Sequence, residues 1–107
     1  MKTKVSKLVD LTFSITSGNK ALVIAIGEVP TSGWLEPELT NDRTVDRIFH
    51  SDFVGTKPTA AAAQVLTPIR AERSFLLRPQ EQQLTIHSET NERSVTLPAA
   101  GDPAISR

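Results

Sequence analysis

The feature that most constrains this chain is a strict alternation of apolar and polar side chains. Residues 9–16 read VDLTFSIT, in which each odd-numbered position is apolar and each even-numbered position is polar. Successive side chains of an extended strand point to opposite faces, so this segment has one apolar face and one polar face. It predicts a strand that packs one face on a core and turns the other to water.

A second run, ALVIAIGEV at residues 21–29, carries apolar side chains on both faces. This pattern is typical of a central strand that is covered on both sides. The residues between the two runs, SGNK at 17–20, favour a turn. The two segments are therefore predicted to form a hairpin.

The rest of the chain offers five further short strands. Pro68 cannot donate a hydrogen bond to a neighbouring strand, so its strand is expected at a sheet edge or with a bulge. Residues 41–43 are expected to form a loop, and TAAAAQVL at 59–66 favours at most about two turns of helix. The predicted strands are 45–54, 64–72, 73–79, 83–88 and 93–97, of which the last two form a closing hairpin.

About seven short strands with little helix predict an all-β fold. The spacing favours an immunoglobulin-like antiparallel β-sandwich, with a small β-barrel as the alternative. A chain of 107 residues is most simply one domain, expected over residues 1–97. Residues 98–107 hold two prolines, a glycine and little to bury, and are expected to be a mobile tail.

Composition argues against several classes of function. Lys plus Arg and Asp plus Glu each total 12, so neither a nucleic acid nor an anionic membrane is an expected partner. The nearest approach to a basic cluster, Lys2, Lys4 and Lys7, is interpreted as a solvated tip. The absence of cysteine excludes Cys-type zinc sites and thiol catalysis. No glycine-rich phosphate loop occurs, and no cofactor is predicted.

Two observations bear on location. The N-terminal segment has a basic start, but Lys7 and Asp10 interrupt its apolar residues, so it lacks the continuous apolar core of a signal peptide. No segment approaches the roughly 20 apolar residues that cross a bilayer. A cytoplasmic location is the expectation.

The segment GEVPTSGWLEPEL, residues 27–39, contains the only tryptophan. Trp34 is predicted to fold back onto a core that has few large side chains, and Gly33 to supply the turn before it. The alternative is an exposed aromatic anchor for a ligand or partner. Glu36 and Glu38 lie two residues apart and share one side of an extended segment. They favour a solvated acidic edge over an acid/base pair, and are binding candidates together with Trp34.

A second candidate group contains both histidines of the chain. His50 and Asp52 share one face of a predicted strand, and His87 lies on another. Two histidines and a carboxylate could hold a metal ion if those strands were neighbours. The spacing alone favours a polar face with a local hydrogen bond, so no metal or catalytic residue is predicted there.

One segment carries a resemblance to known proteins. Val29-Pro30-Thr31 followed by Gly33-Trp34, and later Asp52-Phe53-Val54, resembles a group of small uncharacterised bacterial β-sandwich proteins with a V-P-T-x-G-W turn. The likeness covers roughly residues 20–90. It implies the sandwich fold and supplies no catalytic residue, because the group has no established activity.

These observations favour a binding or protein-interaction module over an enzyme. The segment 30–40 would be its contact surface, and its partner an unidentified protein or a second copy of the chain. A self-associating structural protein is one alternative. A small metal-dependent hydrolase built on His50, Asp52 and His87 is the other.

Overall fold

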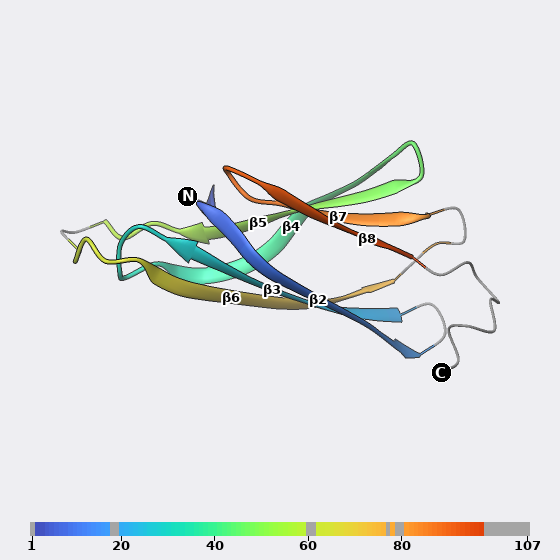
Figure 1. Ribbon diagram of the computed structural model, residues 1–107, viewed down its shortest axis with the longest axis horizontal. Coiled ribbons are helices and arrows are strands. Elements are labelled where there is room, and N and C mark those ends of the chain that lie inside the picture. Colours follow the sequence, from blue (N-terminus) through green and yellow to red (C-terminus); the bar gives the residue numbers. More distant parts are fainter. Residues whose placement is uncertain (1, 18–19, 60–61, 77, 79–80, 98–107) are drawn as a thin grey trace.

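Two β-sheets packed face to face make up the described part of the chain (Figure 1). The computed structural model describes residues 2–17, 20–59, 62–76, 78 and 81–97. These residues contain no helix, and so none long and apolar enough to cross a membrane. Their strands are β1 (Lys2–Lys4), β2 (Lys7–Ser17), β3 (Lys20–Val29), β4 (Leu35–Val45), β5 (Ile48–Thr56), β6 (Thr67–Leu76), β7 (Gln83–His87) and β8 (Glu92–Thr96).

The two sheets differ in how their strands pair. The three-stranded sheet has the order β2-β3-β6, with both pairs antiparallel. In the five-stranded sheet, one edge of β5 pairs with β4. The other edge is divided: residues 48–52 pair with β7 in parallel, and residues 54–56 pair with β1 antiparallel. β8 then pairs with β7.

The all-β sandwich is confirmed, and neither sheet closes into a barrel. The predicted strands at 9–16 and 21–29 are parts of β2 and β3, and the predicted closing hairpin is β7-β8. Pro68 lies in β6, which pairs only with β3, so its predicted edge position is also confirmed. The sandwich is not wholly antiparallel, because β5 and β7 run in the same direction.

β3 is central in its sheet, as predicted, but only one of its faces is fully covered. The face with Ala21, Val23, Ala25 and Val29 is buried in the core. The opposite face, with Leu22, Ile24 and Ile26, is half-buried because only polar neighbours on β2 and β6 flank it. The prediction that both faces are covered was therefore wrong for the outer face.

The N-terminal lysines are exposed, as predicted, but they lie on strands and not at a tip. Lys2 and Lys4 belong to β1, and Lys4 pairs with Val54 of β5. The chain then crosses from one sheet to the other at Val5, which is fully buried and donates its N–H to the carbonyl oxygen of Phe53 at 2.9 Å. Basic composition alone missed this strand because its partner lies some fifty residues away in the sequence.

The turn between β7 and β8 holds this crossover in place. Asn91 uses its side-chain amide as a strand would use its backbone: it accepts from the Leu8 N–H and donates to the Leu8 carbonyl, both at 2.8 Å. Glu89 N–H donates to the carbonyl of Val5 at 2.8 Å. In Figure 1 this turn lies next to the N-terminus. The two sheets are thereby joined by hydrogen bonds as well as by the core.

A predicted loop and a predicted helical segment differ from the structure. Residues 41–43 are not a loop but part of β4, where a register shift and the positive φ of Asn41 (58°) mark a bulge. The described residues of 59–66 are not helical, while residues 60 and 61 lie outside the described part. The predicted tail at 98–107 also lies outside it.

We predict that Gly27→Ala strongly destabilises the fold, because Gly27 faces the crossover. A Cβ at Gly27 would lie 2.5 Å from the carbonyl oxygen of Lys7 and 2.9 Å from Cγ1 of Val5. The first obstacle is backbone, which cannot move aside as a flexible side chain can. The expected loss is about 3 kcal/mol or more, at the upper end of overpacking effects, measured by urea unfolding. An unchanged unfolding midpoint would contradict this account of the crossover.

Candidate functional site

The connection between β3 and β4 has the turn predicted from its sequence. β3 ends at Val29, directly before Pro30, and Gly33 has the positive φ (85°) that glycine adopts readily. Pro58 lies close to Gly33: a Cβ built there would come within 3.3 Å of the Cβ of Pro58. The turn therefore needs a residue without a side chain for two reasons, its backbone angle and its neighbour.

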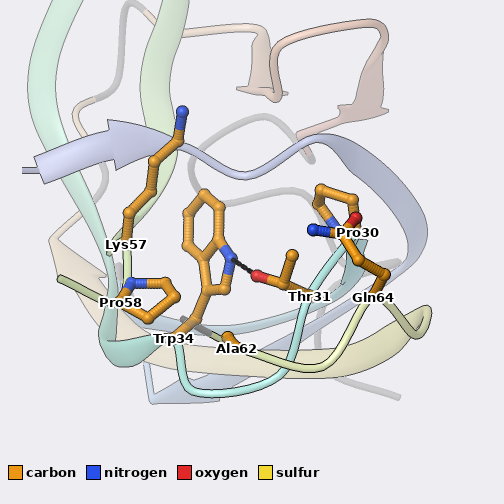
Figure 2. Close-up of a pocket in the computed structure, with 7 residues that line it drawn as sticks. All are labelled: Pro30, Thr31, Trp34, Lys57, Pro58, Ala62 and Gln64. Carbon is orange, nitrogen blue, oxygen red and sulfur yellow. Dashed lines mark hydrogen bonds between the residues drawn. The ribbon is translucent and has the colours of Figure 1, made fainter. Parts of the chain in front are cut away.

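Trp34 follows this turn and has a half-buried position. One part of its side chain packs against the core cluster. Its ring lies over β5 at Gly55, where a Cβ would come within 3.1 Å of Trp34 Cε3. Its Nε1–H donates to Oγ1 of Thr31 at 3.2 Å (Figure 2). Trp34 thus covers the core, as predicted, and also leaves part of its indole open to a pocket.

The pocket has a volume of about 340 Å³ and is formed where two connections meet at one end of the sandwich. Such a volume lies in the range of small-molecule and side-chain binding sites. Figure 2 shows the indole standing between Lys57 and Pro58 on one side and Pro30 and Thr31 on the other. The lining residues are Pro30, Thr31, Trp34, Lys57, Pro58, Ala62 and Gln64.

A backbone hydrogen bond ties the two connections together. Ser32 N–H, in the β3-β4 connection, donates to the carbonyl of Ala63, in the β5-β6 connection, at 3.1 Å. This hydrogen bond fixes the two connections that form the pocket relative to each other. The sequence indicated Trp34 but not the second wall, which includes Lys57, Pro58 and Gln64, because nothing local shows that residues 57–64 return to this turn.

Exposed apolar residues lie next to or near the pocket residues in the sequence. Six large hydrophobic side chains are exposed in the described part of the protein. Three of them adjoin lining residues or follow them closely: Leu35 (63% exposed), Val65 (53%) and Leu66 (70%). Grouped exposed apolar side chains are typical of interaction sites, whereas single scattered ones are ordinary.

Glu36 and Glu38 do not line the pocket. Both are exposed on β4, an edge strand, and both approach the ammonium of Lys2. The Lys2 Nζ lies 3.2 Å from a carboxylate oxygen of Glu38 and 3.7 Å from one of Glu36. They lie on the same side, as predicted, but their ion pairs join β1 to β4 across one end of β5. These contacts favour the acidic-edge interpretation.

The two histidines meet on the outer face of the five-stranded sheet. Nδ1 of His50 and Nε2 of His87 lie 2.8 Å apart, at hydrogen-bond distance. The other ring nitrogen of His87, Nδ1, lies 3.2 Å from a carboxylate oxygen of Glu92. Burial, His87 and the charge of Arg43 lower the pKa of His50, against the opposing charges of Glu92 and Asp52. His50 is therefore neutral at neutral pH.

Asp52 does not join the histidines. Its carboxylate is buried, accepts from Nδ2 of Asn41 at 2.9 Å and forms an ion pair with Arg43 at 3.2 Å. Burial works against its charge, but these hydrogen bonds and the guanidinium hold its pKa below the ordinary value. Among the described residues, no group of three or more His, Asp or Glu side chains has the geometry to hold a metal ion.

Comparison of the chain with protein-family models, with curated proteins and with solved structures gave no match. The resemblance of the Val29–Trp34 turn to bacterial sandwich proteins stays a prediction.

We predict that Gly55→Ala displaces the indole from β5. The added Cβ would lie 3.1 Å from Trp34 Cε3, closer than ordinary carbon contacts, whereas its 3.4 Å distance to Ile69 Cδ1 is an ordinary contact. The expected loss of stability is about 1–3 kcal/mol. Trp34 is the only tryptophan, so its fluorescence should shift to longer wavelength as the ring becomes more exposed. If Gly55→Ala costs as much in a Trp34→Phe background, the indole is not the obstacle.

We also predict that stability falls as the pH drops below His50's ordinary pKa of 6.5. His50's folded-state pKa is lowered, so the folded chain binds fewer protons than the unfolded chain between the two values. Its full contribution is present above pH 6.5 and is lost as the pH falls toward the folded-state value. Urea unfolding at pH 7.5 and 5.5, with a chelator present, measures this loss. His50→Gln should lose less over the same interval, and an equal loss would contradict the assignment.

Proposed function

We propose that this chain is a non-enzymatic binding module that recognises a protein partner at the pocket beside Trp34. The observation that carries the proposal is the open indole surface between two prolines, with the exposed residues Leu35, Val65 and Leu66 next to or near lining residues in the sequence. Aromatic side chains in pockets are the residues that most often dominate binding energy at protein interfaces. An apolar side chain or a proline ring of the partner would enter the pocket.

Lys57 gives the pocket a charge preference. Its side chain runs alongside the indole in Figure 2, and within the described residues it forms no ion pair with a carboxylate. An acidic group next to the partner's apolar residue would pair with this ammonium. The proposed ligand is therefore a peptide segment in which an apolar residue adjoins Asp or Glu.

Several expectations from the sequence accompany this proposal. An immunoglobulin-like layout, a cytoplasmic location and the absence of nucleic-acid and membrane partners are part of the interpretation as a protein-binding module. Self-association is the alternative within it, since a second copy of the chain would bring its own acidic segment, Glu36 to Glu38, as a possible ligand.

Panning of a phage-displayed random peptide library against the full chain tests the proposal. Enriched peptides should combine an apolar residue with Asp or Glu. Lys57→Ala should weaken them by about tenfold, a typical effect of removing one partner of a charge pair at an interface. Lys57→Arg should retain most of the affinity. Lys20→Ala serves as the matched control, because Lys20 is an exposed lysine at the start of β3, away from the pocket.

Trp34 provides the second arm of this experiment. Trp34→Ala should abolish binding of the same peptides, and Trp34→Phe, which keeps a ring over the core, should retain the fold and part of the affinity. Light scattering of the free chain separates a foreign partner from self-association. Peptides that bind both Trp34→Phe and Lys57→Ala as well as the native chain, or a library that yields no binder, would refute the proposal.

A further inference from the structure

The two histidines lie on β5 and β7, outside the pocket beside Trp34, and their rings are at hydrogen-bond distance from each other. β5 and β7 run parallel, with His50 opposite Thr85 and His87 opposite Asp52. The two histidines are therefore one diagonal step apart on adjacent strands, within reach of each other's rings. Phe53, three residues after His50 in β5 and therefore on the alternate face, is in the core, so the histidines occupy the face turned away from the core.

The two ring nitrogens are spaced nearly as two ligands of one metal ion are. With metal–nitrogen bonds of about 2.0–2.1 Å and a bond angle of about 90–110°, ligand nitrogens lie about 2.9–3.4 Å apart. Nδ1 of His50 and Nε2 of His87 are 2.8 Å apart, and their rings are stacked at an angle of 23°. To bind one ion, both rings must turn so that the two nitrogen lone pairs converge on it in place of the hydrogen bond.

Glu92 supplies the second feature of a metal site. A histidine that binds a metal ion commonly donates its other N–H to a carboxylate, which fixes the tautomer and the ring orientation. The Glu92 carboxylate lies 3.2 Å from Nδ1 of His87, the nitrogen turned away from His50. A proton on that nitrogen leaves the lone pair of Nε2 free to face His50.

We propose that His50 and His87 together bind a divalent transition-metal ion such as Zn²⁺ or Ni²⁺, through Nδ1 and Nε2 respectively, with Glu92 orienting His87. Imidazole nitrogen suits these ions. Water or side chains of a partner would complete the coordination. Each imidazole binds a metal ion in its neutral form, so the proton on Nδ1 of His50 moves through solvent to Nε2 of the same ring. Binding weakens at low pH, where protons compete for the ring nitrogens.

Asp52 is outside this site, although the sequence made it a candidate ligand together with the two histidines. Its two carboxylate oxygens are taken by Asn41 and Arg43. A metal ion bound by Asp52 would have to break this buried ion pair, which is costly because a guanidinium would lose its partner. The proposal is thus a two-histidine site with an outer carboxylate, not a site of two histidines and an aspartate.

The full chain allows a direct test by NMR, because His50 and His87 are its only histidines. In Zn²⁺ titrations of the native chain at pH 7.5, the ¹⁵N resonances of His50 Nδ1 and His87 Nε2 should shift together. Substoichiometric Ni²⁺ should broaden both rings at the same concentration. Shifts at other ring nitrogens, or no shift at millimolar Zn²⁺, would overturn the proposal without any variant being made.

Variants give the affinities, measured by Zn²⁺ calorimetry. His50→Gln and His87→Gln should each weaken binding by more than about tenfold, since losing a ligand exceeds the roughly tenfold effect of losing the nearby carboxylate in Glu92→Gln. Glu89→Gln, an exposed carboxylate in the same β7-β8 turn, is the matched control and should bind as the native chain does. Asp52→Asn should also retain binding. Equal affinity in either histidine variant, or loss confined to Asp52→Asn, would overturn the proposal.

Discussion

The division of one edge of β5 between two strands is the constraint on which the rest of this structure depends. β7 occupies residues 48–52 of that edge, so β1 can pair only with residues 54–56 and must be short. The chain then leaves the sheet at Val5 and enters the other sheet as β2. The two sheets approach each other closely at this crossover. Their approach leaves no room for a side chain at Gly27, and it brings the side-chain amide of Asn91 to the carbonyl of Leu8.

Both candidate sites also rest on β5. Residues 51–55 of this strand are buried without interruption, which makes it the most enclosed segment of the five-stranded sheet. At one end Gly55 provides the flat surface on which the indole of Trp34 lies. Toward the other end His50 projects from the outer face beside β7. A rigid strand positions each group, and the side chains that complete each site come from segments distant in the sequence.

The sequence predicted what depends on neighbouring residues. Alternation over 9–16 identified β2, the proline at 68 identified an edge strand, and the glycine at 33 identified a turn with positive φ. It failed where pairing partners are distant. β1 has no apolar alternation of its own and exists because β5 offers a free edge. The polar residues 41–43 resemble a loop, yet they stay in β4 through a bulge and the pairing of Arg43 with His50.

The difference between features set by neighbouring residues and features set by distant pairing partners also applies to the candidate sites. His50 and Asp52 are two residues apart, which predicted that they share one face of a strand, and the structure confirms this. Only the parallel pairing of β5 with β7 brings His87 to His50. Asp52 was a candidate to join them, but the bulge in β4 brings Asn41 and Arg43 to its carboxylate. Each oxygen of this buried carboxylate already has a donor, and a metal ion that bound there would have to compete with the guanidinium of Arg43. The two histidines contact each other, and the carboxylate of Glu92 lies on the far side of the His87 ring, so His50 and His87, and not Asp52, are the side chains of this face that we propose bind a metal ion.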